Sequence, residues 1–276
     1  MATDEVISGH YSHGNLLQAI QAAIARLGKT VETITIDDLG PVDEFHIGGR
    51  LATEHLFDQL SFPEQSHLLD VGCGLGGAAR FVATRYKTQV TGIDLTEEYI
   101  ETGNTLCAWV KLDNQVDLHQ GSATAMPFAN ESFDGAYMLH VGMNIEDKER
   151  LFQEVSRVLR PGSEFAVYDV MRMNQGDLKY PVPWASETSA SHLATPEQYK
   201  QALAQAGFEV TTENNRRDFA LEFFKTQREK TEASGGPPPL GLHTLMKKST
   251  ATKFGNMIEN ISAGYIAPVE MIACKR

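Results

Sequence analysis

The sequence predicts an α/β protein whose core is a seven-stranded, mostly parallel sheet with helices on both faces. Three observations support this prediction. From residue 67 onward, short apolar runs alternate with stretches of helical periodicity, which is typical of parallel strands joined by helices. A glycine-rich turn follows the first apolar run, and about 60 residues of largely helical character precede it. The chain of 276 residues is long enough for one large domain with additions.

Residues 1–60 are expected to form a helical cap. Leu17, Ile20, Ile24 and Leu27 recur at helical spacing and form one apolar stripe, and the glycine that follows them is typical of a helix end. Residues 30–39 are expected to be a β-prone or irregular connection. A second helix is expected over about residues 50–60.

Residues 61–175 are expected to form the ligand-binding core. A helix is predicted over residues 146–159, because its apolar side chains share one face and Pro161-Gly162 follows. Strands are predicted at residues 68–71, 89–93, 116–119, 133–139 and 165–170. Parallel sheets of this kind bind ligands beyond the carboxyl ends of their strands, so the site is expected there.

Residues 176–276 are expected to supply a substrate loop, a helical lid and the last two strands. Thr195-Pro196-Glu197-Gln198 is typical of a helix start, because threonine caps, proline takes the first helical position and glutamine completes a capping box. Strands are predicted at residues 208–212 and 265–274. The mostly helical residues between them, 218–260, are expected to close over the site.

The composition argues against several classes of function. The net charge of −12 is unsuited to a nucleic-acid partner. No apolar run is long enough to span a membrane. Three scattered cysteines and no cluster with zinc spacing predict a reducing, cytoplasmic location and no bound metal. The expected partner is a small molecule, and a homodimer is left open.

The glycine-rich turn fits two cofactors. Gly72-x-Gly74-x-x-Gly77 matches the dinucleotide pattern, and Asp70-x-Gly72-x-Gly74-x-Gly76 matches the pattern of S-adenosylmethionine (SAM) enzymes. Asp94 ends the second strand, 20 residues after Gly74, where a carboxylate can bind ribose hydroxyls; the alternative is a helix-capping or turn residue. Both cofactors contain a ribose, so this aspartate does not distinguish them.

Three further segments separate the two cofactors. Residues 121–128 (GSATAMPF), 131–134 (ESFD) and 157–162 (RVLRPG) follow the glycine turn in order. Together with that turn, this series over about residues 65–172 resembles the class I SAM-dependent methyltransferases. The resemblance implies a Rossmann-like fold, SAM as the cofactor and S-adenosylhomocysteine as the product. An NAD-dependent oxidoreductase is the more distant alternative.

The resemblance also implies the contacts to SAM. Arg50 pairs with the carboxylate of SAM or of the substrate, unless it is a solvated residue at a helix start. The other implied contacts, from the methionine part through the ribose and adenine to the methyl end, are Asp70, Gly72, Gly74, Gly76, Asp94, Leu95, Ser122, Ala123, Leu139 and His140.

The outer segments narrow the expected acceptor. Tyr11, residues 43–50 (DEFHIGGR) and Ala52-Thr53 resemble the sarcosine/dimethylglycine N-methyltransferases, which implies an amine acceptor. The fourth strand departs from that group, with His140 near the place of an acidic residue. O- or C-methylation of a phenol, quinol or isoprenoid is therefore the second alternative. A SAM-binding protein without catalytic activity is the third.

Five residues are candidates for contact with the acceptor. His140 is the candidate general base, because histidine titrates close to neutral pH, unless it is simply a buried histidine hydrogen-bonded to the backbone. Tyr11 and His46 are candidate substrate contacts, although His46 could equally brace its turn. Asn144 could orient the substrate or cap the helix that follows it, and Trp184 could form an aromatic wall or pack its own loop.

Overall fold

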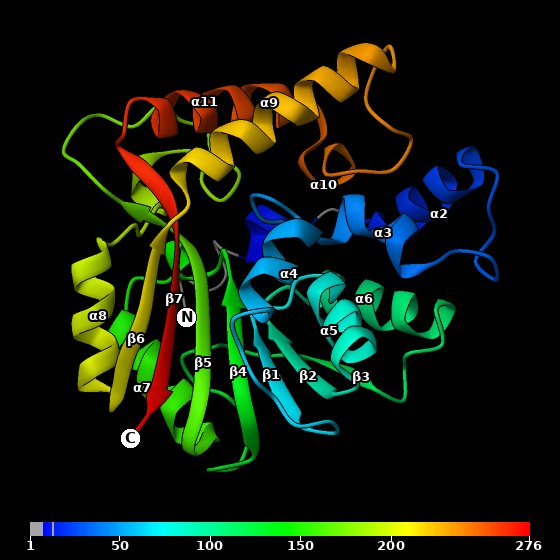
Figure 1. The fold of residues 1–276 in the computed structure, drawn as a ribbon. Coiled ribbons are helices and arrows are strands. Elements are labelled where there is room, and N and C mark those ends of the chain that lie inside the picture. The colour runs from blue at the N-terminus through cyan, green and yellow to red at the C-terminus, as the bar shows by residue number, and fades with distance from the viewer. Residues whose placement is uncertain (1–7, 13) are drawn as a thin grey trace.

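The computed structural model describes residues 8–12 and 14–276, so residues 1–7 and 13 of the expected cap lie outside it. Seven strands form one sheet in the order β3-β2-β1-β4-β5-β7-β6 (Figure 1). Neighbouring strands from β3 to β5 are parallel, and β7 pairs antiparallel with both β5 and β6. The predicted fold class, a mostly parallel seven-stranded sheet, is confirmed.

The strands lie close to their predicted positions, with one correction. Strand β5 begins six residues before the predicted start at residue 165 and includes Pro161. Arg160 precedes this proline, which disfavours helical backbone, so the chain is already extended here. The strands are β1 His67–Val71, β2 Gln89–Asp94, β3 Val116–Gln120, β4 Phe133–Leu139, β5 Leu159–Arg172, β6 Phe208–Asn215 and β7 Ile266–Lys275.

Helices cover both faces of the sheet, and each face carries an apolar core. One core includes Phe152 of α7 and Tyr199 of α8, and the other includes Val82 of α5 and Cys107 of α6. The capping box at the start of α8 is present as predicted, with the Thr195 hydroxyl and the Gln198 side chain exchanging bonds. These helices are α5 Gly77–Tyr86, α6 Glu97–Trp109, α7 Lys148–Val158 and α8 Pro196–Gln205.

The N-terminal segment contains one helix that the sequence analysis did not predict. Residues 30–39 were expected to be β-prone or irregular, but α3 begins at Ile36. The Thr35 side chain accepts from the backbone of Asp38, whose carboxylate accepts from the backbone of Thr35. This capping box stabilises the helix start more than the β-branched residues oppose it. The helices here are α2 Leu16–Arg26, α3 Ile36–Asp43 and α4 Arg50–Phe57.

Three helices between β6 and β7 lie above the carboxyl ends of the parallel strands (Figure 1). They are α9 Arg217–Ala233, α10 His243–Met246 and α11 Thr250–Ser262, called here the insertion. Single 3-10 turns occur at η1 Gly142–Asn144, η2 Thr188–Ala190 and η3 Lys247–Ser249. Within the described chain, none of the helices has the length and apolar character needed to cross a bilayer.

Candidate active site

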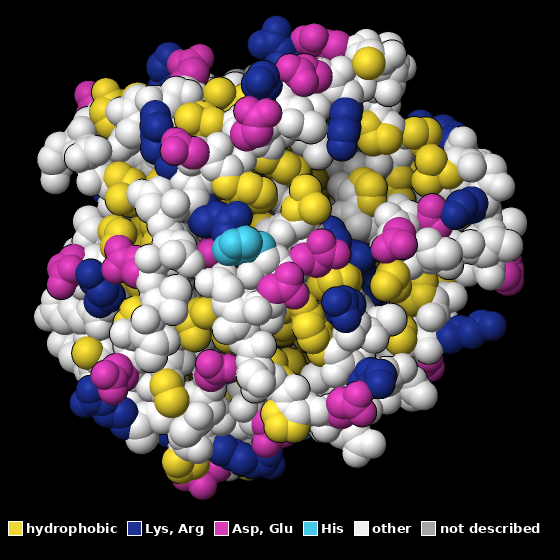
Figure 2. Space-filling view, viewed as in Figure 1, with side chains coloured by type: hydrophobic (Ala, Val, Ile, Leu, Met, Phe, Trp, Pro, Cys, Tyr) yellow, Lys and Arg dark blue, Asp and Glu magenta, His cyan; other side chains and the backbone are white. Residues whose placement is uncertain are grey.

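A cavity of about 1320 Å³ lies between the sheet, the N-terminal helices and the insertion. Its floor is made by the carboxyl ends of β1, β2 and β4, and its roof by α9, α10 and α11. Hydrophobic side chains surround the hollow beneath the insertion in Figure 2. Because pockets for one ligand commonly hold about 300–1,000 Å³, this cavity has room for two molecules together.

The fold brings the predicted site residues together at this cavity, with one exception. Gly76 does not line it; it is the N-cap of α5, where an added Cβ would lie 2.7 Å from the Leu118 side chain. That glycine therefore serves packing. In the described chain, no cluster of three or more His, Cys, Asp or Glu is arranged to hold a metal ion. The predicted lining residues are Tyr11, His46, Arg50, Asp70, Gly72, Gly74, Asp94, Leu95, Ser122, Ala123, Leu139, His140, Asn144 and Trp184.

The glycine-rich turn is held against the end of β2. Gly72 has a φ of 74°, and an added Cβ would lie 2.3 Å from a Val141 methyl carbon, so only glycine fits there. The Asp94 carboxylate accepts from the backbone N–H of Gly74 at 3.0 Å and of Thr96 at 2.9 Å. Two hydrogen bonds leave a carboxylate with further acceptor capacity, which suits ribose hydroxyls.

Asp70 is a buried carboxylate at the end of β1 that faces the cavity with an unused oxygen. Its side chain is 2% exposed, and its Oδ2 has no hydrogen-bond partner within the described residues. Burial raises the pKa of Asp70 to about 8. A cationic ligand would stabilise the charged form of this buried carboxylate, whereas the carboxylate would repel a pyrophosphate. The carboxylates of Asp70 and Asp94 therefore fit SAM, with its ammonium and sulfonium groups, better than a dinucleotide.

A buried ion pair that sequence reasoning missed joins the N-terminal cap to the core. Arg80 donates to Asp43 at 2.5 Å, and both side chains are 1% exposed. The same guanidinium donates to the carbonyl oxygen of Gly103 at 3.3 Å. The pair fixes the end of α3 against α5, beside the glycine turn. The sequence signal that could have predicted this ion pair is Arg80 itself, an arginine within the apolar stretch of α5.

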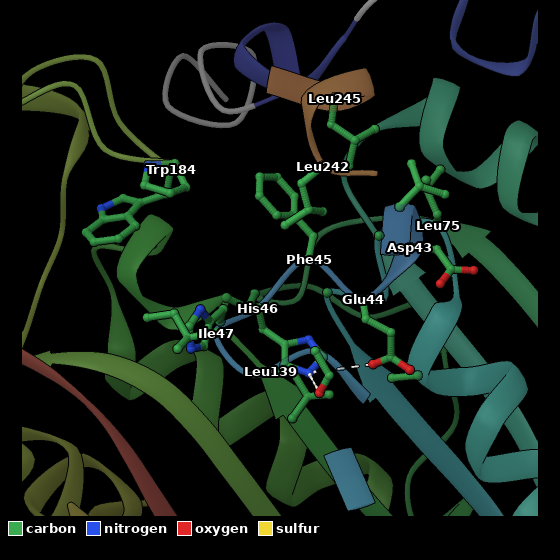
Figure 3. Close-up of a pocket in the computed structure, with 18 of the residues that line it drawn as sticks. Asp43, Glu44, Phe45, His46, Ile47, Leu75, Leu139, Trp184, Leu242 and Leu245 are labelled. Carbon is green, nitrogen blue, oxygen red and sulfur yellow. Dashed lines mark hydrogen bonds and ion pairs between the residues drawn. The ribbon is translucent and has the colours of Figure 1, made fainter. Parts of the chain in front are cut away.

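A glutamate and a histidine lie side by side just after α3 (Figure 3). The Nε2 of His46 is 3.0 Å from the carbonyl oxygen of Gly49, 3.1 Å from the Thr53 hydroxyl and 3.5 Å from Glu44 Oε2. Because a carbonyl only accepts, Nε2 carries the ring proton. Nδ1 then holds the lone pair, and no bond within the described chain occupies it.

His46 is positioned to accept a proton rather than to carry one at rest. It is 7% exposed, and burial lowers its pKa below 6.5 although Glu44 opposes the shift. The imidazole is therefore neutral at pH 7. The adjacent carboxylate would stabilise the imidazolium formed on proton transfer. Sequence reasoning named His46 but not Glu44, whose role depends on how the turn after α3 folds.

His140 follows the last residue of β4 and faces the same space. Its φ is 56°, a left-handed conformation that few non-glycine residues adopt, and its ring centroid is 6.0 Å from that of His46. Its Nε2 has no partner in the described chain. Burial holds the pKa of His140 well below 6.5, so this imidazole is also neutral. His140 has no neighbouring carboxylate like that of His46.

Arg50 lines the cavity, and three of its five N–H donors are already used. It donates to Glu44, to Asp37 and, at 3.4 Å, to the carbonyl oxygen of Ile36, and its guanidinium lies over the Phe81 ring. It is therefore not a freely solvated residue. Its clearest effect is to hold Glu44 in place, and contact with a SAM carboxylate stays a prediction.

Two predicted substrate residues contact each other. The Tyr11 hydroxyl donates to Asn144 Oδ1 at 3.2 Å, across 133 residues of sequence. Asn144 does not cap the next helix, because Asp147 is the N-cap of α7 and accepts from Arg150 N–H. The capping alternative for Asn144 was therefore wrong. The intervening 3-10 turn η1 moves the helix start two residues beyond the expected position, which places Asn144 toward the cavity.

The part of the cavity beneath the insertion is mostly apolar, although Gln227, Arg228, Thr231, Glu232 and His243 also line the cavity. Phe45, Leu242 and Leu245 gather on one side of it and Trp184 on another, above His46 and Leu139 (Figure 3). Trp184 is 3% exposed and donates to the Ser191 hydroxyl at 2.9 Å, so it packs its loop and also lines the cavity. The insertion adds Phe223, Phe224, Phe254, Met257 and Ile258.

Comparisons with known proteins agree with this geometry. A methyltransferase domain model matches residues 69–167. The O-methyltransferase resE of Aspergillus sclerotiorum is 30% identical over 187 residues, covering 66% of this chain and 69% of that protein. The sarcosine/dimethylglycine N-methyltransferase of Halorhodospira halochloris is 28% identical over 171 residues, covering 62% and 61%.

A solved structure supports the same fold over the whole chain. The geranyl diphosphate C-methyltransferase of Streptomyces coelicolor A3(2) superposes with a TM-score of 0.71 at 18% identity, covering 100% of this chain and 99% of that one. The relatives of similar sequence include enzymes named for methylation of oxygen and nitrogen and, in the 24-methylenesterol C-methyltransferase 3 of Arabidopsis thaliana (32% identical over 120 residues, 44% of this chain and 33% of that protein), of carbon. The chain belongs to the class I SAM-dependent methyltransferases and is a SAM-dependent methyltransferase.

Proposed function

We propose that this enzyme methylates a hydroxyl oxygen of a bulky, largely apolar small molecule, with His46 as the general base. This is the second alternative from the sequence. The first, an amine acceptor, draws its support from the resemblance of the outer segments to N-methyltransferases. The lining of the acceptor end of the cavity favours the oxygen acceptor.

The observation that carries the proposal is the contrast between the two ends of the cavity. The end beside β1 and β2 holds Asp70 and Asp94, which suit a cationic, ribose-containing cofactor. The end beneath the insertion holds mostly aromatic and aliphatic side chains, which favour a largely apolar acceptor. The N-methyltransferase resemblance would require a site for a small, polar, charged amine.

Three of the acidic side chains that line the cavity are already paired with arginines, whereas Glu146 and Asp147, which also line it, have no ion pair within the described residues. Asp43 pairs with Arg80, and Glu44 pairs with Arg50. On the insertion, Glu232 pairs with Arg228. An alkylammonium acceptor could use Asp43 or Glu44 only if that buried carboxylate were released from its arginine, which would cost the pair its interaction. A phenol or enol requires no such counter-charge.

Proton removal is the chemistry that the chain itself supplies. Bound SAM supplies a methyl group activated by the positive charge on sulfur. The His46 Nδ1 lone pair accepts the hydroxyl proton as the acceptor oxygen forms its bond to carbon, and the carbon–sulfur bond breaks with its electron pair retained by sulfur. Glu44 stabilises the imidazolium until the proton leaves to water. His140, as the second neutral imidazole, borders the acceptor or replaces His46 as base.

The insertion serves as a lid in this proposal. Its aromatic side chains contact the N-terminal cap and the substrate loop across the cavity, so a bound acceptor would be shielded from water. Exclusion of water strengthens the interaction between Glu44 and the imidazolium and fixes the acceptor in line with the methyl group.

The test is release of S-adenosylhomocysteine over matched acceptors. A bulky aryl alcohol and the aryl amine of the same shape would be compared with sarcosine and dimethylglycine. The proposal expects turnover of the aryl alcohol and none of the two small amines. Turnover confined to the amines would restore the first alternative. Tight SAM binding without turnover of a wide acceptor panel would favour the non-catalytic alternative.

A further inference from the structure

A second, smaller cavity lies behind the acceptor end of the first. Its volume is about 460 Å³. Leu245 lines both cavities, and Pro183, which lines the large one, presents its carbonyl oxygen to two residues of the small one. The polar residues lining the small cavity are His10, Ser12, Ser186, Lys247, Ser249 and Lys253.

The lining of this cavity is wholly basic or neutral. Two lysines, one histidine and three serines contribute to it, and the described lining includes no carboxylate. The chain as a whole carries a net charge of −12, so a cavity whose charged lining residues are all basic differs in sign from the protein as a whole. Ammonium, imidazole and hydroxyl groups are the donors that bind oxyanions.

Lys253 is a buried cation with no counter-charge among the described residues. It is 8% exposed, and no carboxylate of the described residues lies within 4.0 Å of its Nζ. Its two hydrogen-bond neighbours are the Pro183 carbonyl oxygen at 3.2 Å and His10 Nε2 at 3.4 Å. An ammonium has three donors, so one remains available. Burial of an ammonium is unfavourable unless an anion accompanies it.

The position of Lys253 in its helix adds to this imbalance. It lies in the opening turns of α11, a 13-residue helix with no acidic side chain in its first turn. The N-terminus of a helix carries partial positive charge and favours anions. A lysine there, with Lys247 just before the helix, places three sources of positive potential around one cavity. Each of them would be stabilised by the same bound anion.

We propose that this second cavity is a binding site for a small oxyanion, a phosphate or a carboxylate, held by Lys253, His10 and the surrounding hydroxyls. The anion comes either from solution or from an anionic substituent of the acceptor, because Leu245 and Pro183 separate this cavity from the acceptor end of the active site. Anion binding itself does not depend on which atom the enzyme methylates.

The first experiment measures binding of inorganic phosphate and of acetate to the ligand-free enzyme by calorimetry. The variant Lys253→Met keeps the length of the side chain and removes its charge. The control Lys248→Met removes the same charge from an exposed neighbour that does not line the cavity. We expect Lys253→Met to weaken binding at least about tenfold, since a charged hydrogen bond contributes roughly 1.5–3 kcal/mol, and Lys248→Met to leave it unchanged.

A second experiment identifies the source of the anion. An aryl alcohol accepted by the enzyme would be compared with its carboxylate-bearing analogue in both variants. If the acceptor supplies the anion, Lys253→Met raises KM for the carboxylate analogue alone. If the anion is free, KM is unaffected while phosphate binding is lost. Equal binding of phosphate and acetate by the wild type, Lys253→Met and Lys248→Met, or no binding by any of them, overturns the proposal irrespective of the methylation assay.

Discussion

Replacement of His46 by glutamine tests the proposed base with little change in shape. The glutamine side-chain amide can occupy the place of the imidazole Nε2 and continue to donate to the Gly49 carbonyl oxygen. It has no group able to accept a proton near neutral pH. The turn before α4 should therefore keep its conformation while the lone pair facing the acceptor is lost.

The expected loss follows from the surroundings of the imidazole. General-base catalysis contributes about 10²–10⁴ in rate. Glu44 lies 3.5 Å from Nε2, which at an effective dielectric constant of about 20 stabilises an imidazolium by about 5 kcal/mol. Arg50, which pairs with the same carboxylate, cancels part of this. We therefore expect kcat to fall about 10³-fold, or about 4 kcal/mol in the barrier.

The assay is S-adenosylhomocysteine release as a function of pH, with the dissociation constant of SAM measured by calorimetry. Burial holds the pKa of His46 below 6.5, so the wild-type rate should rise with pH in the range below 6.5 and be level above it. The variant should lose this rise and bind SAM as the wild type does. The control His119→Gln changes an exposed histidine paired with Asp117, outside the cavity, and should behave as wild type.

A result within threefold of wild type for His46→Gln would refute the reasoning. His140→Gln separates the two histidines, because His140 lacks a carboxylate partner and its pKa lies further below 6.5. If His140→Gln abolished the pH-dependent rise while His46→Gln retained it, the base would be His140, as the sequence analysis expected.

Four further outcomes are expected. Asp94→Asn should raise the SAM dissociation constant about 10- to 100-fold by calorimetry, because a charge-assisted hydrogen bond contributes roughly 1.5–3 kcal/mol; a change below threefold would contradict ribose binding. Burial raises the pKa of Asp70 to about 8, so a cationic ligand should bind more tightly, up to about tenfold per unit, as the pH rises from about 6 to 7.5. Asp70→Asn should flatten that slope, and a slope unchanged in the variant would assign it to another group. Leu242→Ala should raise the acceptor KM by up to about 30-fold with kcat preserved, since it removes roughly 2 kcal/mol of apolar contact; an unchanged KM would place the acceptor elsewhere. Arg80→Met should lower the free energy of unfolding in urea by about 3–5 kcal/mol, because it leaves Asp43 buried and unpaired, and a loss below 1 kcal/mol would contradict this.

The sheet and the cofactor end of the site were predictable because their signals are local. The glycine turn, Asp70 and Asp94 each sit at the end of an apolar run, and the ends of parallel strands meet at one edge of a sheet. The position of each of these residues at the end of a predicted strand was therefore enough to place them together in the fold. The capping box at Thr195 was predictable for the same reason, since it involves residues three apart.

The acceptor end could not be predicted because its residues meet only through the tertiary fold. Phe45 and Leu242 are almost 200 residues apart and lie in one apolar cluster. Tyr11 and Asn144 are joined by a hydrogen bond that neither local sequence indicates. Arg50 likewise donates to Glu44, which the fold of a turn places beside it, and this contact could not be predicted from the sequence. Side-chain direction within turns and helical insertions is not specified by periodicity alone.

The most direct test of the proposed function uses one acceptor that offers both atoms. A bulky aromatic molecule bearing a hydroxyl and an amine on equivalent positions would be incubated with the enzyme and SAM labelled with ¹³C in its methyl group. The product would be analysed by NMR correlation of the labelled carbon with its neighbouring atoms. The proposal predicts the label on oxygen, with formation of this product lost in His46→Gln. The label on nitrogen, at an undiminished rate in that variant, would contradict both the oxygen acceptor and the histidine base.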